Sequence, residues 1–391
     1  MWTVIHIIDI VLWIIMALSV VYVAFFAIVS LLPSRSSSLS PLPSHLSPHL
    51  SSFLILYPAY KEDSVILYSV SQFLEQKYPK ELYQVAVISD HMEDTTNQQL
   101  KKLPITLHTI SFEKSSKAKA LQYAMQHTDK SYDYVVILDA DNVVLPDFLE
   151  QLNASCQKGC QAIQCHRCAK NSDNNIAVLD GASEEINNTI FRKAHNTIGL
   201  SSALIGSGMC FNFEWFKQHV ELLNSAVEDR ELESLLLQER IYIKFEKDIH
   251  VFDEKVSNRD NFEQQRLRWL NGQLQTLLIM LPNIPHAIAT GNINYIDKTI
   301  QQTLIPRSIL LILIPLFSFI MALLAPVWSI KWWGLFFILC FSLYIVIPAR
   351  MRNGTVFGKL GSFPKLAFKM LKNLFRLNRN NKDFLHTTHG E

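Results

Sequence analysis

The chain has 391 residues, of which 49% are apolar and 18% are charged. Typical soluble domains carry roughly 25% charged residues, so part of this chain is expected to lie in lipid, and a disordered or collagen-like chain is excluded. Its 36 Lys and Arg almost balance its 35 Asp and Glu, so no overall positive field favours nucleic acid as a partner.

The chain begins with a long apolar run. No charged residue lies between Ile10 and Leu32, and about 20 apolar residues are enough to cross the hydrocarbon core as a helix. Residues 1–32 are therefore predicted to form a transmembrane helix. A cleaved signal peptide is the alternative, but no Lys or Arg lies between Met1 and Asp9, where such a peptide carries its positive charge.

A linker and a folded body follow this span. Residues 33–52 are rich in Ser and Pro, which predicts an extended linker. From 53 to 271, short β-rich runs alternate with helical patterns, which is typical of an α/β domain with a mostly parallel sheet. Strands are expected over 53–57, 83–89, 106–110, 134–138 and 162–166, and helices near 65–75, 117–125 and 146–156.

Polar residues follow the predicted strands, and ligands of such sheets bind at the carboxyl ends of the strands. Pro58, Tyr60 and Glu62 follow the first strand, and Asp90 follows the second. These four residues are therefore candidate ligand-binding residues.

Two carboxylates, Asp139 and Asp141, follow the fourth predicted strand. Carboxylates at a strand end are costly to leave unpaired, and a divalent cation bound with a phosphate ligand is one solution. The alternative is a turn in which Asp141 and Asn142 cap the helix that begins near Pro146.

Four of the six cysteines, Cys156, Cys160, Cys165 and Cys168, lie close together in the sequence. Their spacing differs from the paired C-x2-C pattern of zinc knuckles. Buried thiols in a reducing compartment are therefore the favoured interpretation, with a zinc site as the alternative. The nucleotide-binding patterns G-x-G-x-x-G after the first strand and G-x-x-x-x-G-K-[ST] anywhere are missing from the sequence, which argues against dinucleotide binding and P-loop ATP hydrolysis.

Two further candidate segments lie in the second half of the body. Gly206, Ser207 and Gly208 interrupt an apolar stretch, where a flexible backbone lets a ligand approach closely. Glu228 and Asp229 begin a helical pattern. Their alternative role is to stabilise the first turn of that helix through its dipole.

A third segment places Gln265, Arg268 and Trp269 on one side of a helix by their i, i+3, i+4 spacing. The alternative is a solvated Arg beside a Trp at the membrane interface. Residues 272–307 are predicted to form interfacial helices because prolines and a glycine interrupt their uncharged stretch.

The chain ends with a predicted transmembrane hairpin over 308–349, with a tight connection at 329–331, and a basic tail over 350–391. Within the tail, 363–377 has the pattern of an amphipathic helix on an anionic surface, with an ordinary solvated tail as the alternative. Basic residues beside the spans predict a protein of the inner or plasma membrane, with the body and C-terminus cytoplasmic and Met1 outside.

In this order, the motifs resemble those of the membrane-embedded family 2 glycosyltransferases, the group of cellulose, chitin and hyaluronan synthases and many bacterial polysaccharide enzymes. The resemblance implies a GT-A fold and inverting sugar transfer from a nucleotide diphosphate sugar, most often UDP-linked, with Mg²⁺ or Mn²⁺. By its motifs, Asp90 would bind the donor base, Lys117 would match the Lys of G-K-x-x-A-L, and Asp139 would lie along the donor diphosphate. Asp141 would be the main metal ligand, with Asp139 as the second.

The later motifs complete the resemblance. Asp229 matches the catalytic base and Arg268 the diphosphate-binding Arg, while Trp269 would border the acceptor sugar. The remaining candidates for the acceptor side are Gly206, Ser207, Gly208, Glu228 and Gln265.

The sequence departs from the family pattern at Lys61, where Asn is frequent, and at Ser116, where Gly is usual. It also has Gly206-Ser207-Gly208 in place of C-G-T, and it lacks the extra spans of polymer-secreting synthases. The favoured function is hexosyl or N-acetylhexosaminyl transfer to a membrane-associated saccharide or lipid, for cell-surface polysaccharide or glycolipid synthesis. The alternative is a weak or inactive homologue that binds a nucleotide sugar as a membrane-bound subunit.

Overall fold

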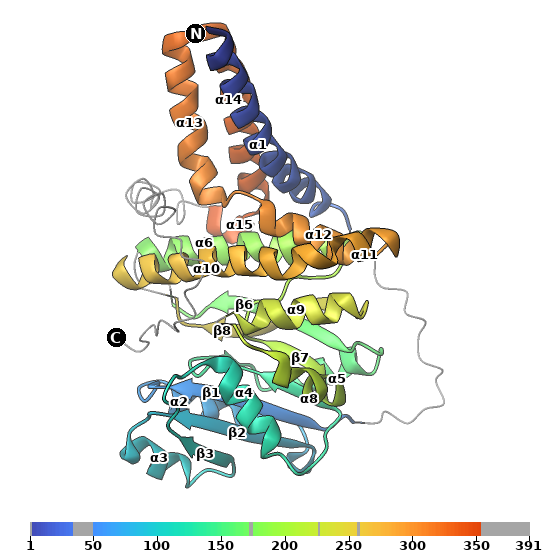
Figure 1. Cartoon of the computed structure of the whole chain (residues 1–391). Coiled ribbons are helices and arrows are strands. Elements are labelled where there is room, and N and C mark those ends of the chain that lie inside the picture. The colour runs from blue at the N-terminus through green and yellow to red at the C-terminus, as the bar shows by residue number, and fades with distance from the viewer. Residues whose placement is uncertain (1, 34–49, 172–174, 226, 256–258, 353–391) are drawn as a thin grey trace.

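The computed structural model describes residues 2–33, 50–171, 175–225, 227–255 and 259–352. Three levels follow one another in Figure 1. The helices α1, α13 and α14 extend away from the body at one end, a layer of helices that includes α6, α10, α11 and α12 lies below them, and the sheet with its covering helices forms the rest.

One mixed sheet of eight strands has the order β3-β2-β1-β4-β7-β6-β8-β5. Strands β3, β2, β1 and β4 are parallel, β7 is antiparallel to β4 and β6, β8 is parallel to β6, and β5 is antiparallel to β8. The strands are β1 (Phe53–Tyr60), β2 (Tyr83–Asp90), β3 (Thr106–Ile110), β4 (Tyr134–Ile137), β5 (Val143–Val144), β6 (Ala162–Ala169), β7 (Met209–Asn212) and β8 (Ile243–Asp253).

The sheet is buried on both faces, which explains its continuous apolar runs. In β1, Phe53, Ile55 and Tyr57 point into one core and Leu54 and Leu56 into the other, as the two-residue period of a strand requires. The covering helices on the first face are α2 (Ile66–Phe73) and α5 (Phe148–Cys156), and those on the second are α4 (Lys117–Gln126), α8 (Phe213–His219) and α9 (Glu228–Gln238).

The five predicted strands and three predicted helices are all present, with end points that differ by a few residues. The predicted parallel pairing is confirmed for β1 to β4. Strands β5, β7 and β8 were not predicted, and β7 makes the second half of the sheet mixed. Shorter elements are η1 (Lys80–Leu82), α3 (Asp94–Leu100) and η3 (Val220–Leu222).

Helices connect the sheet to the candidate spans. Helix α6 (Asn175–Asn187) continues into a π-helix (Asn188–Ala194) and α7 (His195–Thr197), while α10 (Arg259–Met280) leads through η4 (Leu281–Asn283) to α11 (Ile284–Ala289) and α12 (Ile293–Thr303). The last helices form where interfacial helices were predicted. They lie between the sheet and the spans in Figure 1.

Three helices are long and apolar enough to cross a membrane, namely α1 (Trp2–Val29), α13 (Arg307–Leu324) and α14 (Pro326–Val346). The predicted connection at 329–331 is wrong, because the chain turns at Ala325 and Pro326 begins α14. Lys331 therefore lies inside α14, where its ammonium pairs with the carboxylate of Asp9 in α1. Trp332 Nε1 donates to the other oxygen of Asp9 at 2.7 Å.

Several predicted segments fall partly or wholly outside the described residues. They are most of the linker, from 34 to 49, and the predicted amphipathic helix at 363–377. A short helix, α15 (Ala349–Arg352), is the last described element.

Candidate active site

A cavity of about 820 Å³ lies at the carboxyl ends of β1, β2 and β4, within the size range of small-molecule sites. Most of the residues that the sequence singled out line it, although they come from distant parts of the chain. They are Pro58, Tyr60, Glu62, Asp90, Lys117, Asp139, Asp141, Gly206, Glu228, Asp229, Arg268 and Trp269.

Lys117 lies at the centre of the charged end of the cavity. It begins α4, whose N-cap Ser116 accepts a hydrogen bond from the backbone of Lys119. Its ammonium pairs with the Asp139 carboxylate, donates to the backbone oxygen of Gly206 at 2.6 Å and lies 3.6 Å from Glu228 Oε1. Burial opposes the charge, but the neighbouring carboxylates outweigh it and raise the pKa of Lys117, so this residue is a cation at neutral pH.

Gly206 lets a loop approach these side chains closely. Its φ is +71°, a conformation that favours glycine, and a Cβ atom there would lie 3.8 Å from Asp229 Oδ2 and 3.9 Å from Lys117 Nζ. The backbone of this loop therefore forms part of the cavity wall between α4 and α9.

Glu228 and Asp229 both lie in the first turn of α9, where Asp229 Oδ1 accepts a hydrogen bond from the backbone of Arg230 at 2.9 Å. Glu228 is only 7% exposed. Burial, and then the negative charges of Asp229 and Asp139, raise the pKa of Glu228 to about 7, although Lys117 opposes the shift. The first turn of α9 therefore contributes to the cavity, where the carboxylates of Asp139, Glu228 and Asp229 lie around Lys117 among the described residues.

Hydrogen bonds from Glu254 and Asn142 orient the Asp141 carboxylate. Its Oδ2 accepts from the backbone of Glu254 at 2.7 Å, and its Oδ1 accepts from Asn142 Nδ2 at 3.1 Å. The proposed capping of the next helix does not occur, because the N-cap of α5 is Asp147, which makes no capping hydrogen bond through its side chain. Asp139 and Asp141 both line the cavity, and such oxygen ligands suit a hard cation such as Mg²⁺ or Mn²⁺.

Asp90 ends β2 and lines the same cavity. Its Oδ1 accepts from the backbone of Phe112 at 3.2 Å and lies 2.6 Å from His91 Nδ1. Asp90 is only 3% exposed, so these contacts fix the carboxylate at the edge of the sheet.

Two predicted acceptor-side residues, Ser207 and Gly208, lie behind the cavity wall. The Ser207 hydroxyl accepts from the backbone of Asp139 at 3.2 Å and donates to Asn142 Oδ1. A Cβ at Gly208 would lie 3.0 Å from Val251 Cγ2. Both residues therefore support the turn that carries Asp139. Gln265 lies in α10, but its side chain is outside the described part of the structure.

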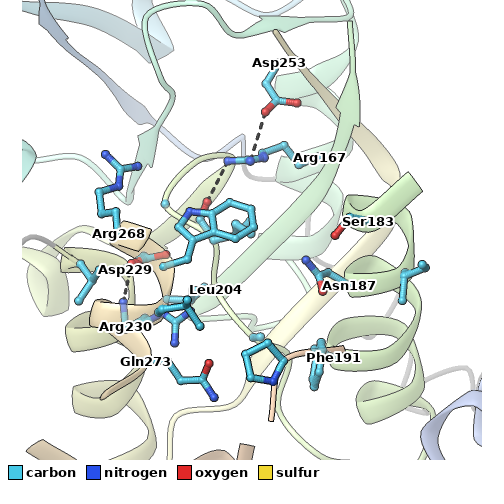
Figure 2. Close-up of a pocket in the computed structure, with 18 of the residues that line it drawn as sticks. Arg167, Ser183, Asn187, Phe191, Leu204, Asp229, Arg230, Asp253, Arg268 and Gln273 are labelled. Carbon is cyan, nitrogen blue, oxygen red and sulfur yellow. Dashed lines mark hydrogen bonds and ion pairs between the residues drawn. The ribbon is translucent and has the colours of Figure 1, made fainter. Parts of the chain in front are cut away.

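Several charged cavity residues were not singled out from the sequence, among them Arg167, Asp253 and Glu254. Arg167 in β6 pairs with Asp253 Oδ2 at 3.2 Å and donates to the backbone oxygen of Ile205 at 3.3 Å (Figure 2). Asp253 ends β8 and Glu254 follows it, so a correct prediction of that strand would have identified both by the strand-end rule applied to Asp139.

The four cysteines that are close in sequence do not form a single cluster. Cys156 and Cys165 lie in the apolar core, and Cys160 packs against it. Cys168 instead lies beside His166 and His250, with the nearest ligand atoms of the three residues within 4.8 Å of one another. All six cysteines are free thiols.

A family model described as "Glycosyl transferase family group 2" matches residues 134–347. The chain belongs to this family. A search of curated protein sequences found no match.

A solved structure agrees with this assignment at the level of the fold. A mannosyltransferase of Pyrobaculum calidifontis, PcManGT, solved with GDP-Man and Mn²⁺, has a TM-score of 0.52 at 17% identity, covering 93% of this chain and 99% of that one. TarS of S. aureus, solved with UDP-GlcNAc, has a TM-score of 0.43 at 13% identity, covering 82% and 89%. The first of these matches and the family model together give the chain a GT-A fold, as the sequence predicted.

Proposed function

We propose that this protein transfers a sugar, with inversion, from a nucleotide diphosphate sugar to an acceptor at the membrane surface. The observation that carries this proposal is the convergence of Asp139, Glu228 and Asp229 around Lys117, in one cavity at the strand ends of a family 2 glycosyltransferase. UDP-sugars are the first donors to test. GDP-sugars are the second, because PcManGT was solved with GDP-Man.

Asp229 is the proposed general base. Its carboxylate takes the proton of an acceptor hydroxyl while that oxygen bonds to the anomeric carbon of the donor sugar. The bond from this carbon to the diphosphate breaks, and the nucleoside diphosphate leaves with the electron pair. A base in this position contributes about 10²- to 10⁴-fold to the rate.

The leaving diphosphate needs positive charge near it. A divalent ion held by Asp141 and Asp139 would supply electrostatic stabilisation of that charge. Arg268 lines the same cavity and is proposed to contact the diphosphate, while Asp90 is proposed to bind the donor base. Trp269 offers an apolar ring face to the acceptor sugar.

The membrane supplies the second substrate in this proposal. The layer of α6, α10, α11 and α12 lies between the sheet and the candidate spans in Figure 1. Residues at the strand ends and residues of α13 and α14 both line the cavity. We infer a cytoplasmic catalytic domain, because basic residues beside the spans favour that orientation and nucleotide sugars are made in the cytoplasm.

The test is release of nucleoside diphosphate by the purified full-length chain from a panel of UDP- and GDP-sugars, with and without Mg²⁺ or Mn²⁺. Asp141→Ala should abolish release, because it removes the proposed main metal ligand. Asp94→Ala is the matched control, since Asp94 is an exposed carboxylate in α3.

Three outcomes separate the alternatives. Metal-dependent release that Asp141→Ala abolishes and Asp94→Ala retains supports the proposal. Binding of a nucleotide without release from any donor supports the inactive nucleotide-sugar-binding subunit. Full release by Asp141→Ala contradicts the proposed metal site.

A further inference from the structure

The cavity continues from Asp229 toward the candidate spans. At that end α6 and the π-helix form one wall, and α13 and α14 form the other. We call this part of the cavity the apolar arm, defined by Ala182, Ile186, Phe191, Leu311, Cys340 and Leu343. A sugar and a nucleotide gain little from such a surface, so its occupant is expected to be hydrocarbon.

The apolar arm reaches the outer surface of the hairpin. Tyr344 lines the cavity and is 46% exposed. On the same helix, Phe337 and Phe341 are 66% and 65% exposed, and they would face acyl chains if α14 spans the bilayer. A molecule in the hydrocarbon core can therefore enter the arm sideways between the helices.

Three arginines line the cavity between Asp229 and the apolar arm. Arg230 donates to Gln302 Oε1 at 2.7 Å, and Arg307 donates to Asn187 Oδ1 at 2.7 Å. Figure 2 shows Arg230, Asn187 and Phe191 around this part of the cavity.

The third arginine, Arg192, is 2% exposed and is anchored through Nη1 to Glu184 at 2.8 Å. Its Nε has no hydrogen-bond partner among the described residues. Planar guanidinium groups are well suited to phosphate, so the middle of the cavity suits a phosphate group.

We propose that the acceptor is a saccharide joined through phosphate to one long apolar chain resident in the membrane. This inference rests on the proposed function. The acceptor hydroxyl lies at Asp229, the phosphate lies near Arg230 and Arg307, and the chain occupies the apolar arm. A single chain fits better than two, because the cavity of about 820 Å³ must also hold the donor.

The proposal predicts a dependence on chain length. Each methylene that moves from water into the arm should tighten acceptor binding by about fourfold until the arm is filled. The probes are synthetic isoprenyl diphosphate-linked monosaccharides of increasing chain length, given to the full-length protein in an amphipathic polymer without added lipid, because a bilayer would itself take up the chain. The comparison acceptors are the free monosaccharides and alkyl glycosides without phosphate. KM should fall with chain length and rise at least tenfold without the phosphate.

A tryptophan placed in the arm tests the site directly. Cys340→Trp should raise KM for long-chain acceptors at least tenfold and remove most of the dependence of KM on chain length. The matched control is Phe337→Trp, on the exposed face of the same helix and outside the cavity lining. It should behave like the unchanged protein with every acceptor.

A photoactivatable isoprenyl diphosphate measures occupancy without turnover. Cross-links to the peptide that contains Leu343 and Tyr344, lost in Cys340→Trp, support the inference. Cross-links that avoid this peptide overturn it. Donor cleavage with a KM independent of chain length and of Cys340→Trp also overturns it, and leaves the proposed function intact. Specific cross-links without release from any donor support the lipid site and contradict the proposed sugar transfer.

Discussion

Two buried charge clusters line the same cavity but differ in balance. The Lys117 cluster sets one cation, Lys117, against the carboxylates of Asp139, Glu228 and Asp229. As a result, a proton is retained near neutral pH, since the pKa of Glu228 rises to about 7.

The Glu184 cluster has the opposite balance. Glu184 lies 2.8 Å from Arg192, 3.6 Å from Arg167 and 4.0 Å from Lys255. Burial would raise the pKa of Glu184, but these three cations hold it far below its usual range. Asp253 also pairs with Arg167 at 3.2 Å and with Lys255 at 2.9 Å. Three cations therefore face two carboxylates in this cluster, whereas three carboxylates lie around Lys117 among the described residues.

The largest effect is expected from breaking the Lys117 cluster at its proposed base. Asp229→Asn should lower turnover by about 10²- to 10⁴-fold, because the amide cannot take the acceptor proton. The melting temperature should change little, since the amide oxygen of Asn can still accept the hydrogen bond that Arg230 N donates to Asp229. Nucleoside diphosphate release and thermal denaturation measure the two effects, and full turnover by Asp229→Asn would remove the catalytic assignment.

A change in the Glu184 cluster should lower the free energy of unfolding. Glu184→Gln leaves Arg192, Arg167 and Lys255 with less compensating charge in a buried site, which costs about 3–5 kcal/mol of unfolding free energy. The melting temperature should fall by roughly 10 °C. Glu150→Gln, at an exposed carboxylate in α5, is the control. An unchanged melting temperature in Glu184→Gln would show that the cluster is not structural.

The next largest effect is expected in the pH dependence of stability, to which Glu228 of the Lys117 cluster should contribute. The pKa of Glu228 rises from 4.5 to about 7 on folding, so the folded state binds the extra proton between these values. Stability is therefore higher at pH 4.5 and falls as the pH rises toward 7. Glu228→Gln should remove this part of the fall in metal-free thermal denaturation. An identical pH slope in Glu228→Gln would refute the raised pKa.

The smallest effect is expected from changing Ser207, an uncharged residue that supports the Asp139 turn of the Lys117 cluster. Ser207→Ala removes the hydroxyl that accepts from the backbone of Asp139, but Asn142 Oδ1 still accepts from the same group at 3.0 Å. The expected loss is about 1 kcal/mol, or roughly 2–4 °C in melting temperature. A fall in melting temperature as large as that of Glu184→Gln would contradict this expectation. It would mean that Ser207 matters more to the stability of this turn than the buried charges do.

The sequence predicted the parts of the site that follow regular strands. Asp90, Asp139 and Asp141 were identified because apolar runs precede them and parallel strands present their carboxyl ends together. Asp253 was missed because β8 was not predicted, although its alternating polar and apolar residues are a strand signal. Arg167 directly follows the predicted strand 162–166, so the strand-end rule applied there could have identified it.

The sequence also did not predict where the helices of the candidate transmembrane hairpin begin and end. The connection of the hairpin was predicted at 329–331, which includes the charged residue Lys331. In the structure that charge has a partner nearly the whole chain away, in Asp9. Only the packing of α1 against α14 shows that the lysine belongs inside the helix.

The Asp9–Lys331 pair also implies an order of biogenesis. If α1 and α14 span a bilayer, Asp9 lies in or beside the lipid without its counter-charge, at a cost, until Lys331 and Trp332 pack against it, because α1 is made long before α14. A truncated chain that stops before the hairpin would keep that cost, and cellular proteases would have a physical reason to discard it.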